Sequence, residues 1–529
     1  MKIALISTYA HPIALGLRYV SSFLKHHGHD VEMLFFSSKR RTDGAVFSQR
    51  LLDDCVDRLR SADLIGVSLM TNTFRRACVL SEAIRRAGIR SPIVWGGIHP
   101  TVAPQESIEV ADIVCVGEGE QAMLELAEAL EAGRDPTGIE SLWFRRDGRV
   151  LRNPIRRLQA NLDGLPFPDY DLQRHWVASD KGLVPARPEN LRGALHRYRV
   201  ETTRGCPNQC TFCNNAALLK VYKGKGKWVR KRSNEDVIAE LETMIGRFAT
   251  IEAVNIVDDL FFIRDEEDID QFAQMYRQRI NLPLEVDAFP NTISRRKVES
   301  LRRLPISLIS MGIQSGCQKT LYEIYKRRTP IENIVRAIET FSQLNIRAEY
   351  HYIINNPYEP DENQIETMRF AATHHRGPAI VRVFPLQFYP GTPLYERAQA
   401  DGLLGRGHEL AYQCTYSGKL YYKASSYLGV WLSVVLGLRN RGVSSQGVHR
   451  LIDVVTAPAV RRVLDRPWFT PAAHLCYLAG RIIAKNIIYQ LFIRPLRHLR
   501  RRRRSGQPHR QGQSALPRRG RLFDSRVIS

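Results

Sequence analysis

Along residues 1–135, short apolar runs typical of strands alternate with segments in which apolar residues recur at helical spacing. Short apolar runs such as KIALIST, HDVEMLFF and DLIGVSL predict buried strands. Between the first two, LGLRYVSSFLKHHG has the spacing of an amphipathic helix that ends at Gly28. The repeated strand–helix order predicts an α/β domain with a doubly wound parallel sheet and helices on both faces.

A second alternating run begins at Tyr198. Its six predicted strands are RVETTR, AVNIVDD, LEVDAFP, LISMGIQ, IRAEYHYII and VRVFPLQFY, with helical segments between them. Ser233 and Asp236 have the spacing of a capping box at the start of one helix. Six βα units predict a partial, TIM-like (β/α)6 barrel over residues 198–400. In such barrels the chemistry takes place at the carboxyl ends of the strands.

The remaining segments lack this rhythm. Residues 136–197 are rich in prolines and turns, and we expect a linker with one hairpin. Residues 401–493 are expected to form a C-terminal helical region. Its apolar run YLGVWLSVVLGL is too short to span a bilayer directly. The later segment HLCYLAGRIIAKNIIYQLFIRPL carries charged and polar residues among apolar ones, which suits an amphipathic helix.

Charge changes the picture at the C-terminal end. The chain has 529 residues and a net charge of +23, and residues 494–529 contain twelve arginines but one acidic residue, Asp524. We expect this tail to be disordered, and either to meet an anionic membrane surface or to be solvated without a partner. Nucleic acid is not expected as a partner. The N-terminus lacks the pattern of a signal peptide, so we expect a cytoplasmic protein, peripheral at the inner face of the membrane where the tail binds.

Three of the nine cysteines are concentrated in ETTRGCPNQCTFCNN, as Cys206, Cys210 and Cys213. Three thiolates in one loop can hold three irons of a [4Fe–4S] cluster and leave the fourth iron open to another ligand. Zinc is the alternative. Structural zinc sites usually combine two short pairs of ligands, and no second pair lies nearby. The spacing therefore favours an iron–sulfur cluster.

This CxxxCxxC loop, with the aromatic Phe212 before its last cysteine, resembles the signature of the radical S-adenosylmethionine (SAM) enzymes. The resemblance implies that SAM chelates the open iron. An electron from the cluster then cleaves SAM to a 5′-deoxyadenosyl radical, which removes hydrogen from the substrate. An electron donor of the flavodoxin or ferredoxin type is implied as well.

The same resemblance implies SAM contacts at two strand ends. Asp258 and Asp259 follow the second strand of the predicted barrel, and Gln314 and Ser315 follow the fourth. The alternative is structural, with the aspartates capping a helix. The GGE motif of many family members is not present as such, which puts the assignment of individual residues in doubt.

The first domain resembles the Rossmann-like, cobalamin (B12)-binding domains that precede such barrels. Four strand-end loops carry the likeness: YAHPIALGL, GVSLMT, GGIHPT and GEGE. Glycine lets the backbone approach a broad ring closely. The DxHxxG motif that supplies a histidine to cobalt is missing, so His11 and His99 are expected to be structural or edge contacts. The implied cobalamin-binding residues are Thr8, Leu15, Gly16, Ser68, Thr71, Gly96, Gly97, His99, Gly117, Glu118 and Gly119.

The combined resemblance implies a cobalamin-dependent radical SAM enzyme, and we expect a methyltransferase that acts on an unactivated carbon of a small or lipid-like substrate. The corrin must then face the mouth of the barrel. Three alternatives stay open. The first is oxidative ring closure or rearrangement, the second is a methylthiotransferase with a second cluster on Cys55, Cys78 and Cys115, and the third is an electron-transfer protein without catalysis. No catalytic acid or base can be named from the sequence.

Overall fold

The structure is a computed structural model that describes residues 1–9, 12–36, 46–375, 379–404, 412, 427–440 and 442–464. The chain divides into two compact units. One contains residues 1–353 and 374–415, and the other contains residues 354–373 and 416–529. His11, the predicted amphipathic segment at residues 474–496 and the basic tail at residues 494–529 lie outside the described residues.

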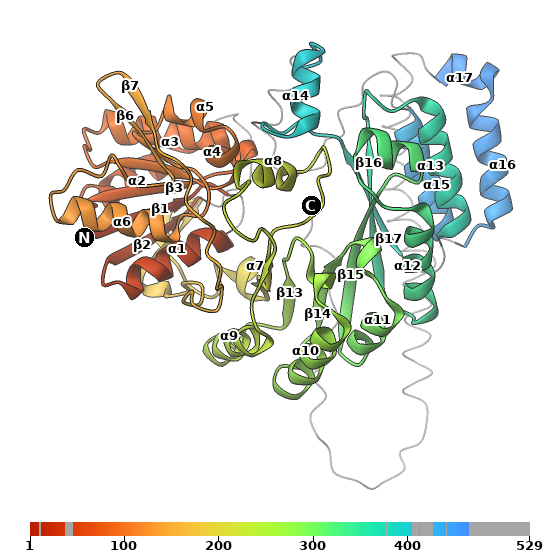
Figure 1. Cartoon of the computed structure of the whole chain (residues 1–529), viewed down its shortest axis with the longest axis horizontal. Helices are drawn as coiled ribbons and strands as arrows, with labels where there is room; N and C mark the ends of the chain where they lie inside the picture. The colour runs from red at the N-terminus through yellow and green to blue at the C-terminus, as the bar shows by residue number, and fades with distance from the viewer. Residues whose placement is uncertain are drawn as a thin grey trace, which may run out of the picture. The chain divides into compact units, whose positions relative to one another are not determined.

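The first sheet has nine strands in the order β7-β6-β5-β4-β3-β1-β2-β8-β9. Its parallel centre consists of β1 (Lys2–Ser7), β2 (Asp30–Phe35), β3 (Leu64–Ser68), β4 (Ile93–Gly96) and β5 (Ile113–Cys115). The helices between and after these strands are α1 (Leu15–His26), α2 (Gln49–Leu59), α3 (Phe74–Arg86), α4 (Ile98–Val102), α5 (Pro104–Ile108) and α6 (Glu120–Glu131). On one face α1 contacts α6, and on the other α2 contacts α3 (Figure 1). This confirms the doubly wound domain.

The predicted linker contains two hairpins, so the expectation of a single hairpin is wrong. Strands β6 (Leu142–Arg146) and β7 (Arg149–Arg152) extend the sheet beyond β5. Strands β8 (His175–Ser179) and β9 (Gly182–Pro185) extend it beyond β2. Each hairpin pairs an edge that would otherwise expose unpaired backbone groups. The first has the Asp147–Gly148 turn, both with positive φ, which is a recognisable hairpin signal.

The second sheet has six strands in chain order, which confirms the partial barrel. They are β10 (Arg197–Val200), β13 (Ala253–Ile256), β14 (Leu284–Ala288), β15 (Ile306–Gln314), β16 (Ala348–Ile354) and β17 (Ile380–Pro385). Helices α9 (Asn234–Arg247), α10 (Glu266–Arg279), α11 (Arg295–Arg302) and α12 (Ile331–Gln343) lie along one side of it (Figure 1). The predicted cap is present, because Ser233 Oγ accepts a hydrogen bond from Asp236 N at 3.2 Å.

Smaller elements surround the start of this sheet. A two-stranded ribbon consists of β11 (Thr203–Arg204) and β12 (Arg230–Lys231). The first unit also contains the helices α7 (Arg192–Leu195), α8 (Asn214–Val221) and α14 (Pro393–Ala400). Short 3-10 or π turns lie at Thr71–Thr73, Leu172–Arg174, Phe261–Ile263, Pro290–Thr292 and Thr320–Ile324.

The second unit is helical where it is described. It contains α15 (Tyr427–Asn440), α16 (Ser445–Thr456), α17 (Pro458–Leu464) and most of α13 (Asp361–His374). Arg369 of α13 pairs with Asp453 of α16 at 2.7 Å, and Arg461 of α17 pairs with Asp361 of α13. Within the described ranges, none of the helices is both long enough and apolar enough to cross a bilayer.

Candidate functional site

The three clustered cysteines lie in the loop between β11 and α8. Gly205 opens this loop with φ 90°, and a Cβ there would collide with the carbonyl oxygen of Trp228, so only glycine fits. The Trp228 indole donates to the Cys206 carbonyl at 2.8 Å. Cys213 is the N-cap residue of α8. The loop therefore follows the carboxyl end of the first barrel strand, as predicted.

The cysteine sulfurs lie among hydrogen-bond donors and apolar side chains. Cys206 and Cys210 are buried, and Asn208 Nδ2 lies 3.3 Å from Cys206 Sγ. Arg327 Nη1 lies 3.7 Å from Cys210 Sγ, while Nη2 of the same side chain donates to the Gly312 carbonyl at 2.6 Å. Donors to sulfur and the degree of burial tune iron–sulfur clusters. Arg327 was missed by the sequence reasoning, because YKRRT looks like a solvated basic run.

The donor set fits a cubane cluster. Burial raises the pKa of the thiols of Cys206 and Cys213, and neighbouring cysteines contribute to the increase. Among the described residues, no three His, Cys, Asp or Glu side chains are grouped to bind a single metal ion. A cubane does not need such convergence, because each cysteine ligates a different iron. Three neighbouring thiols with an amide and a guanidinium beside them are suitable for this cluster.

The two aspartates after β13 have different surroundings. Asp258 is buried and accepts hydrogen bonds from Thr202 N at 2.5 Å, from Thr203 N at 2.9 Å and from the Thr202 hydroxyl. It therefore fixes the backbone that leads into the cluster loop. Asp259 is exposed, accepts from Asn215 Nδ2 at 2.8 Å and contributes to the raised thiol pKa values of Cys206 and Cys213. Of the two, Asp259 has the carboxylate available to a ligand beside the cluster loop.

The remaining predicted SAM residues lie at the end of β15 and in the cluster loop. Gln314 has φ 72°, and its amide folds back over Gly312, where a Cβ would collide with it. Ser315 is buried, and its hydroxyl accepts from Cys317 N at 3.1 Å. Phe212 packs edge-on against Tyr325, with ring centroids 5.0 Å apart. Arg327 thus joins the two regions, because it contacts both Cys210 and the Gly312 carbonyl.

The predicted cobalamin residues divide into buried and accessible ones. Thr8 Oγ1 donates to the Ser68 carbonyl at 3.1 Å, and Thr71 Oγ1 lies 3.2 Å from His99 Nδ1. His99 is fully buried, and burial lowers its pKa to about 4, so it is neutral near pH 7. These buried side chains support the strand-end loops from within the domain. Gly16 is exposed with no neighbour in the space a Cβ would take, and Leu15 is half-buried beside it.

A close neighbour explains two of the five predicted cobalamin-binding glycines, Gly97 and Gly117. Gly97 has φ 100°, and a Cβ would lie 2.7 Å from the Leu69 carbonyl oxygen. Gly117 has φ 99°, and a Cβ would collide with the Tyr222 hydroxyl. For Gly96 the nearest atom, Cys115 Cβ, is 3.7 Å away, and for Gly119 the nearest atom is Val20 Cγ2 at 3.4 Å. At Gly117 the close neighbour, Tyr222, comes from the barrel rather than from the first domain.

The GEGE loop of the first domain docks on the barrel. Arg230 forms a two-point ion pair with Glu118, at 2.6 and 3.0 Å, and the Tyr222 hydroxyl accepts from Glu118 N at 2.6 Å. Arg204 lies 3.4 Å from Glu118 and 3.0 Å from Glu120. Burial alone would raise the pKa of Glu118, but the hydrogen bonds from Arg230 and the charge of Arg204 hold it below the usual range. The side chain of Glu118 therefore holds the two domains together.

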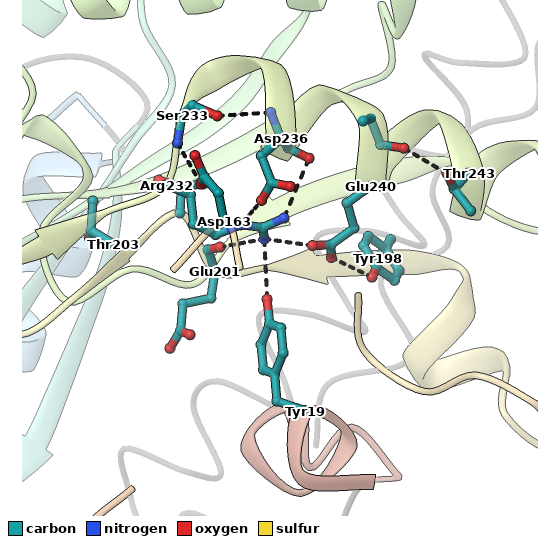
Figure 2. A network of polar contacts seen from close by, with 12 residues as sticks. Tyr19, Asp163, Tyr198, Glu201, Thr203, Arg232, Ser233, Asp236, Glu240 and Thr243 are labelled. Atoms are coloured by element: carbon teal, nitrogen blue, oxygen red, sulfur yellow. Dashed lines mark hydrogen bonds and ion pairs between the residues drawn. The ribbon is translucent and has the colours of Figure 1, made fainter. Parts of the chain in front are cut away.

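A second docking contact lies nearby, around Arg232 (Figure 2). Its guanidinium pairs with Glu240 at 2.5 Å and with Asp236 at 2.6 Å, both on α9, and donates to the Tyr19 hydroxyl of α1 at 3.1 Å. Tyr198 of β10 donates to the other oxygen of Glu240 at 2.6 Å. No pattern in the sequence singled out Arg232, Arg230 or Arg204, because each resembles a surface charge.

The cysteines considered for a second cluster are separated. Cys55 lies in α2, Cys78 in α3 and Cys115 in β5, and Cys55 and Cys115 are buried. Burial raises the pKa of all three thiols, to about 11 for Cys78 and about 12 for Cys115. Their positions inside two helices and a strand, rather than in one loop, favour a packing role over iron ligation.

One surface depression of about 600 Å³ lies away from these loops. It is lined at the amino ends of β4 and β5 by residues that include Pro92, Asp112 and Ile113. Ligands of doubly wound sheets bind at the carboxyl ends of the strands. The depression is therefore at the opposite edge from the candidate site.

Comparison with known proteins agrees with the two domains. The B12 binding domain model matches residues 1–127, and the Radical SAM superfamily model matches residues 200–371. An uncharacterized methyltransferase, PH0819, from Pyrococcus horikoshii is 27% identical over 399 residues, covering 74% of this chain and 79% of that protein. An anaerobic magnesium-protoporphyrin IX monomethyl ester cyclase from Rubrivivax gelatinosus is 25% identical over 325 residues, covering 58% of this chain and 54% of that protein.

The fold is also found among solved structures. The radical S-adenosylmethionine methyltransferase TsrM from Kitasatospora setae, solved with tryptophan substrate and a SAM analogue, superposes with a TM-score of 0.59 at 18% identity. The superposition covers 77% of each chain. At this level of identity the comparison establishes the shared two-domain fold.

Proposed function

Since this chain belongs to the cobalamin-dependent radical SAM enzymes, in which a B12-binding domain precedes a radical SAM core, we propose that it methylates an unactivated carbon of its substrate. The cofactors are a [4Fe–4S] cluster, SAM and cobalamin. When bound, the cluster with SAM supplies a hydrogen-abstracting radical, and cobalamin supplies the methyl group. The chain's share is to position these groups and tune their surroundings.

The observation that carries the proposal is the docking of the two cofactor loops. Arg204 lies two residues before Cys206, and its guanidinium contacts Glu118 and Glu120 of the first domain and Glu201 beside β10, the last at 2.7 Å. Because the predicted cluster loop and the predicted cobalamin loop share one arginine, their cofactors would face a common space. Methyl transfer needs this arrangement, because the hydrogen abstraction and the methyl delivery act on the same carbon.

Individual side chains have distinct tasks in this scheme. Cys206, Cys210 and Cys213 would hold the cluster, with Arg327 donating to Cys210 Sγ. The exposed carboxylate of Asp259 would accept from the amino group of SAM, whereas Asp258 holds the Thr202–Thr203 backbone in place. The buried Thr8, Thr71 and His99 would support the loops around the corrin without ligating cobalt.

The test measures both uses of SAM. We expect anaerobically reconstituted, cobalamin-loaded protein, supplied with a low-potential one-electron reductant and with SAM labelled in its methyl group, to form S-adenosylhomocysteine, with the label transferred to cobalamin, as well as 5′-deoxyadenosine. Cys206→Ala should abolish 5′-deoxyadenosine while cobalamin methylation continues. Formation of 5′-deoxyadenosine without any S-adenosylhomocysteine would contradict methyl transfer.

The second candidate is oxidative ring closure without methylation, which the cyclase relative favours. It uses the same two domains and the same loops. The labelling experiment separates the candidates, because ring closure leaves the methyl group of SAM in methionine. A product whose mass lacks the labelled methyl group would select the cyclase.

The proposal extends to partners outside the described residues. We expect reduction by a flavodoxin- or ferredoxin-type donor, and a cytoplasmic protein that meets the inner membrane face through residues 494–529, where each basic residue contributes about 1 kcal/mol. A lipid-like or membrane-derived substrate would suit this location. Sedimentation with anionic vesicles tests the tail, and equal binding of the full chain and a chain ending at residue 493 would remove its role.

A further inference from the structure

The six-stranded sheet has one apolar face and one polar face. Alternate residues such as Val286, Ile309 and Met311 are buried, as expected of the side covered by α9–α12. The residues between them point to the opposite face, which is the interior of the partial barrel. On β14 to β17 these interior residues include Asp287, Ser310, Glu349, His351 and Arg382, and Asp287 is exposed there.

Asp287, Ser310 and Glu349 lie side by side on three neighbouring strands and form a row of hydrogen-bond acceptors. The strand register places Asp287 beside Ser310, and Ser310 beside Glu349. Ser310 hydrogen-bonds to the Asp287 carboxylate. Glu349 Oε1 accepts from Arg382 Nε at 2.6 Å and lies 2.8 Å from His351 Nε2, whereas Glu349 Oε2 makes no hydrogen bond although the residue is only 5% exposed. A buried carboxylate oxygen without a donor indicates that a donor is to be supplied.

The carboxylates of this face differ in their cationic partners. Glu285 pairs with Arg197 at 3.1 Å and lies near Arg199, and Glu349 pairs with Arg382, whereas no arginine of the described residues forms an ion pair with Asp287. Although solvent reaches its side chain, crowding by the surrounding protein raises the pKa of Asp287 to about 6 against the effects of His351 and Ser310, and the carboxylates of Glu349 and Glu285 contribute to this increase. A cation placed between Asp287 and Glu349 would stabilise the charged form of both carboxylates.

The row also lies near the cluster loop. Gly312 is the next interior position of β15 after Ser310, and its carbonyl accepts from Arg327, which contacts Cys210. A substrate group held by Asp287 and Glu349 would thus lie one interior position from Gly312, which shares Arg327 with Cys210 of the cluster loop. A molecule anchored there can extend another carbon toward the cluster loop.

We propose that Asp287 and Glu349 bind a protonated amine of the substrate, with Ser310 orienting Asp287, so that the enzyme acts on amine-bearing molecules. The ammonium supplies the donor that Glu349 Oε2 lacks and a cationic partner for Asp287, which has none among the described residues. The inference rests on the proposed function only for the chemical step after binding. Arg382 and His351 act as positioning residues, because they hold Glu349 Oε1 and leave Oε2 free.

The test uses butylammonium, butanol and butyrate as matched probes, which carry a cationic, a neutral and an anionic group on the same short alkyl chain. Binding is followed by ligand-observed nuclear magnetic resonance on the cluster- and cobalamin-loaded protein, without reductant, near neutral pH. We expect butylammonium to bind at least about tenfold more tightly than butanol, and Asp287→Asn and Glu349→Gln each to weaken it by about tenfold. The butanol affinity of these variants should not change.

Glu242→Gln is the matched control, because Glu242 is a surface carboxylate paired with Arg279, and it should leave butylammonium binding unchanged. Equal binding of the two probes, preferred binding of butyrate, or unchanged affinity in Asp287→Asn would overturn the proposal. Because nothing is reduced or cleaved in this measurement, its failure leaves the labelling result for methyl transfer standing. A failed labelling experiment likewise leaves the amine site standing.

Discussion

The two sheets of this chain differ in how many of their faces are buried. In the first sheet β1, β3 and β5 are buried along nearly their whole length, so side chains that meet a ligand must lie in loops at the strand ends. In the second sheet β15 alternates between buried and half-exposed positions, and its open face is polar. The first domain can therefore hold a cofactor only at one edge, whereas the second can surround a substrate with side chains.

The largest expected effect comes from the cluster loop. Cys210→Ala removes one of three iron ligands, and we expect 5′-deoxyadenosine formation to fall to the background of unreconstituted protein. Cys115→Ala, in the doubly covered sheet, should keep the activity, because that buried thiol packs within the first domain. The absorbance of the cluster and a nucleoside assay check both. Full activity of Cys210→Ala would show that Cys210 is not an iron ligand and does not differ from Cys115.

The contact between the two regions gives the next effect. Arg204→Gln leaves Glu118, Glu120 and Glu201 in a half-buried cluster without the cation that they share, which costs about 3 kcal/mol. We expect the ratio of S-adenosylhomocysteine to 5′-deoxyadenosine to fall, because the cobalamin loop is no longer held at the cluster loop. Arg279→Gln, at a surface pair, is the control. An unchanged ratio would mean that Arg204 does not couple the domains.

Buried titrating groups in the two regions give opposite pH dependences. Burial lowers the pKa of His99 from 6.5 to about 4, so its contribution is complete above pH 6.5 and about 3 kcal/mol is lost as the pH falls to 4. Burial raises the pKa of Asp258 from 3.8 to about 6, against hydrogen bonds from Thr202 and Thr203. Its contribution, also about 3 kcal/mol, is complete below pH 3.8 and is lost as the pH rises to 6.

Urea denaturation across this pH range measures these contributions. In the wild-type chain the free energy of unfolding should fall on acidification because of His99, and this fall should be smaller in His99→Gln. It should also fall as the pH rises because of Asp258, and this second fall should be smaller in Asp258→Asn. Slopes of the same sign for both groups would contradict the assignment of one buried base and one buried acid.

The smallest expected effect compares the same substitution in both sheets. Leu64 of β3 is fully buried, so Leu64→Ala should cost about 3 kcal/mol. Leu308 of β15 is half-buried on the open face, so Leu308→Ala should cost about 2 kcal/mol less, because less apolar surface loses its contacts. Urea denaturation followed by circular dichroism checks the difference. Equal costs would show that the open face is packed after all.

Most elements of the fold could be predicted from local pattern. The apolar runs placed the five central strands of the first sheet and all six strands of the second, and Ser233 marked the start of α9. The second hairpin of the linker was missed. Its strands, β8 and β9, carry a weaker turn signal than Asp147–Gly148, and their pairing with β2 joins residues more than 130 positions apart. Long-range pairing leaves no periodicity in the sequence.

The candidate site divides in the same way. Cys206, Cys210 and Cys213 lie in one continuous loop, so their spacing in the sequence by itself was sufficient to predict an iron–sulfur cluster. The resemblance then implied its chemistry. Only the tertiary structure decided that Asp258 supports the backbone while Asp259 is accessible, that Arg204 joins Glu118, and that Asp287 lies beside Glu349. A charge in a sequence looks the same whether it is solvated or buried. Its role depends on which distant charge the folded chain places within a few ångströms of it, at low dielectric.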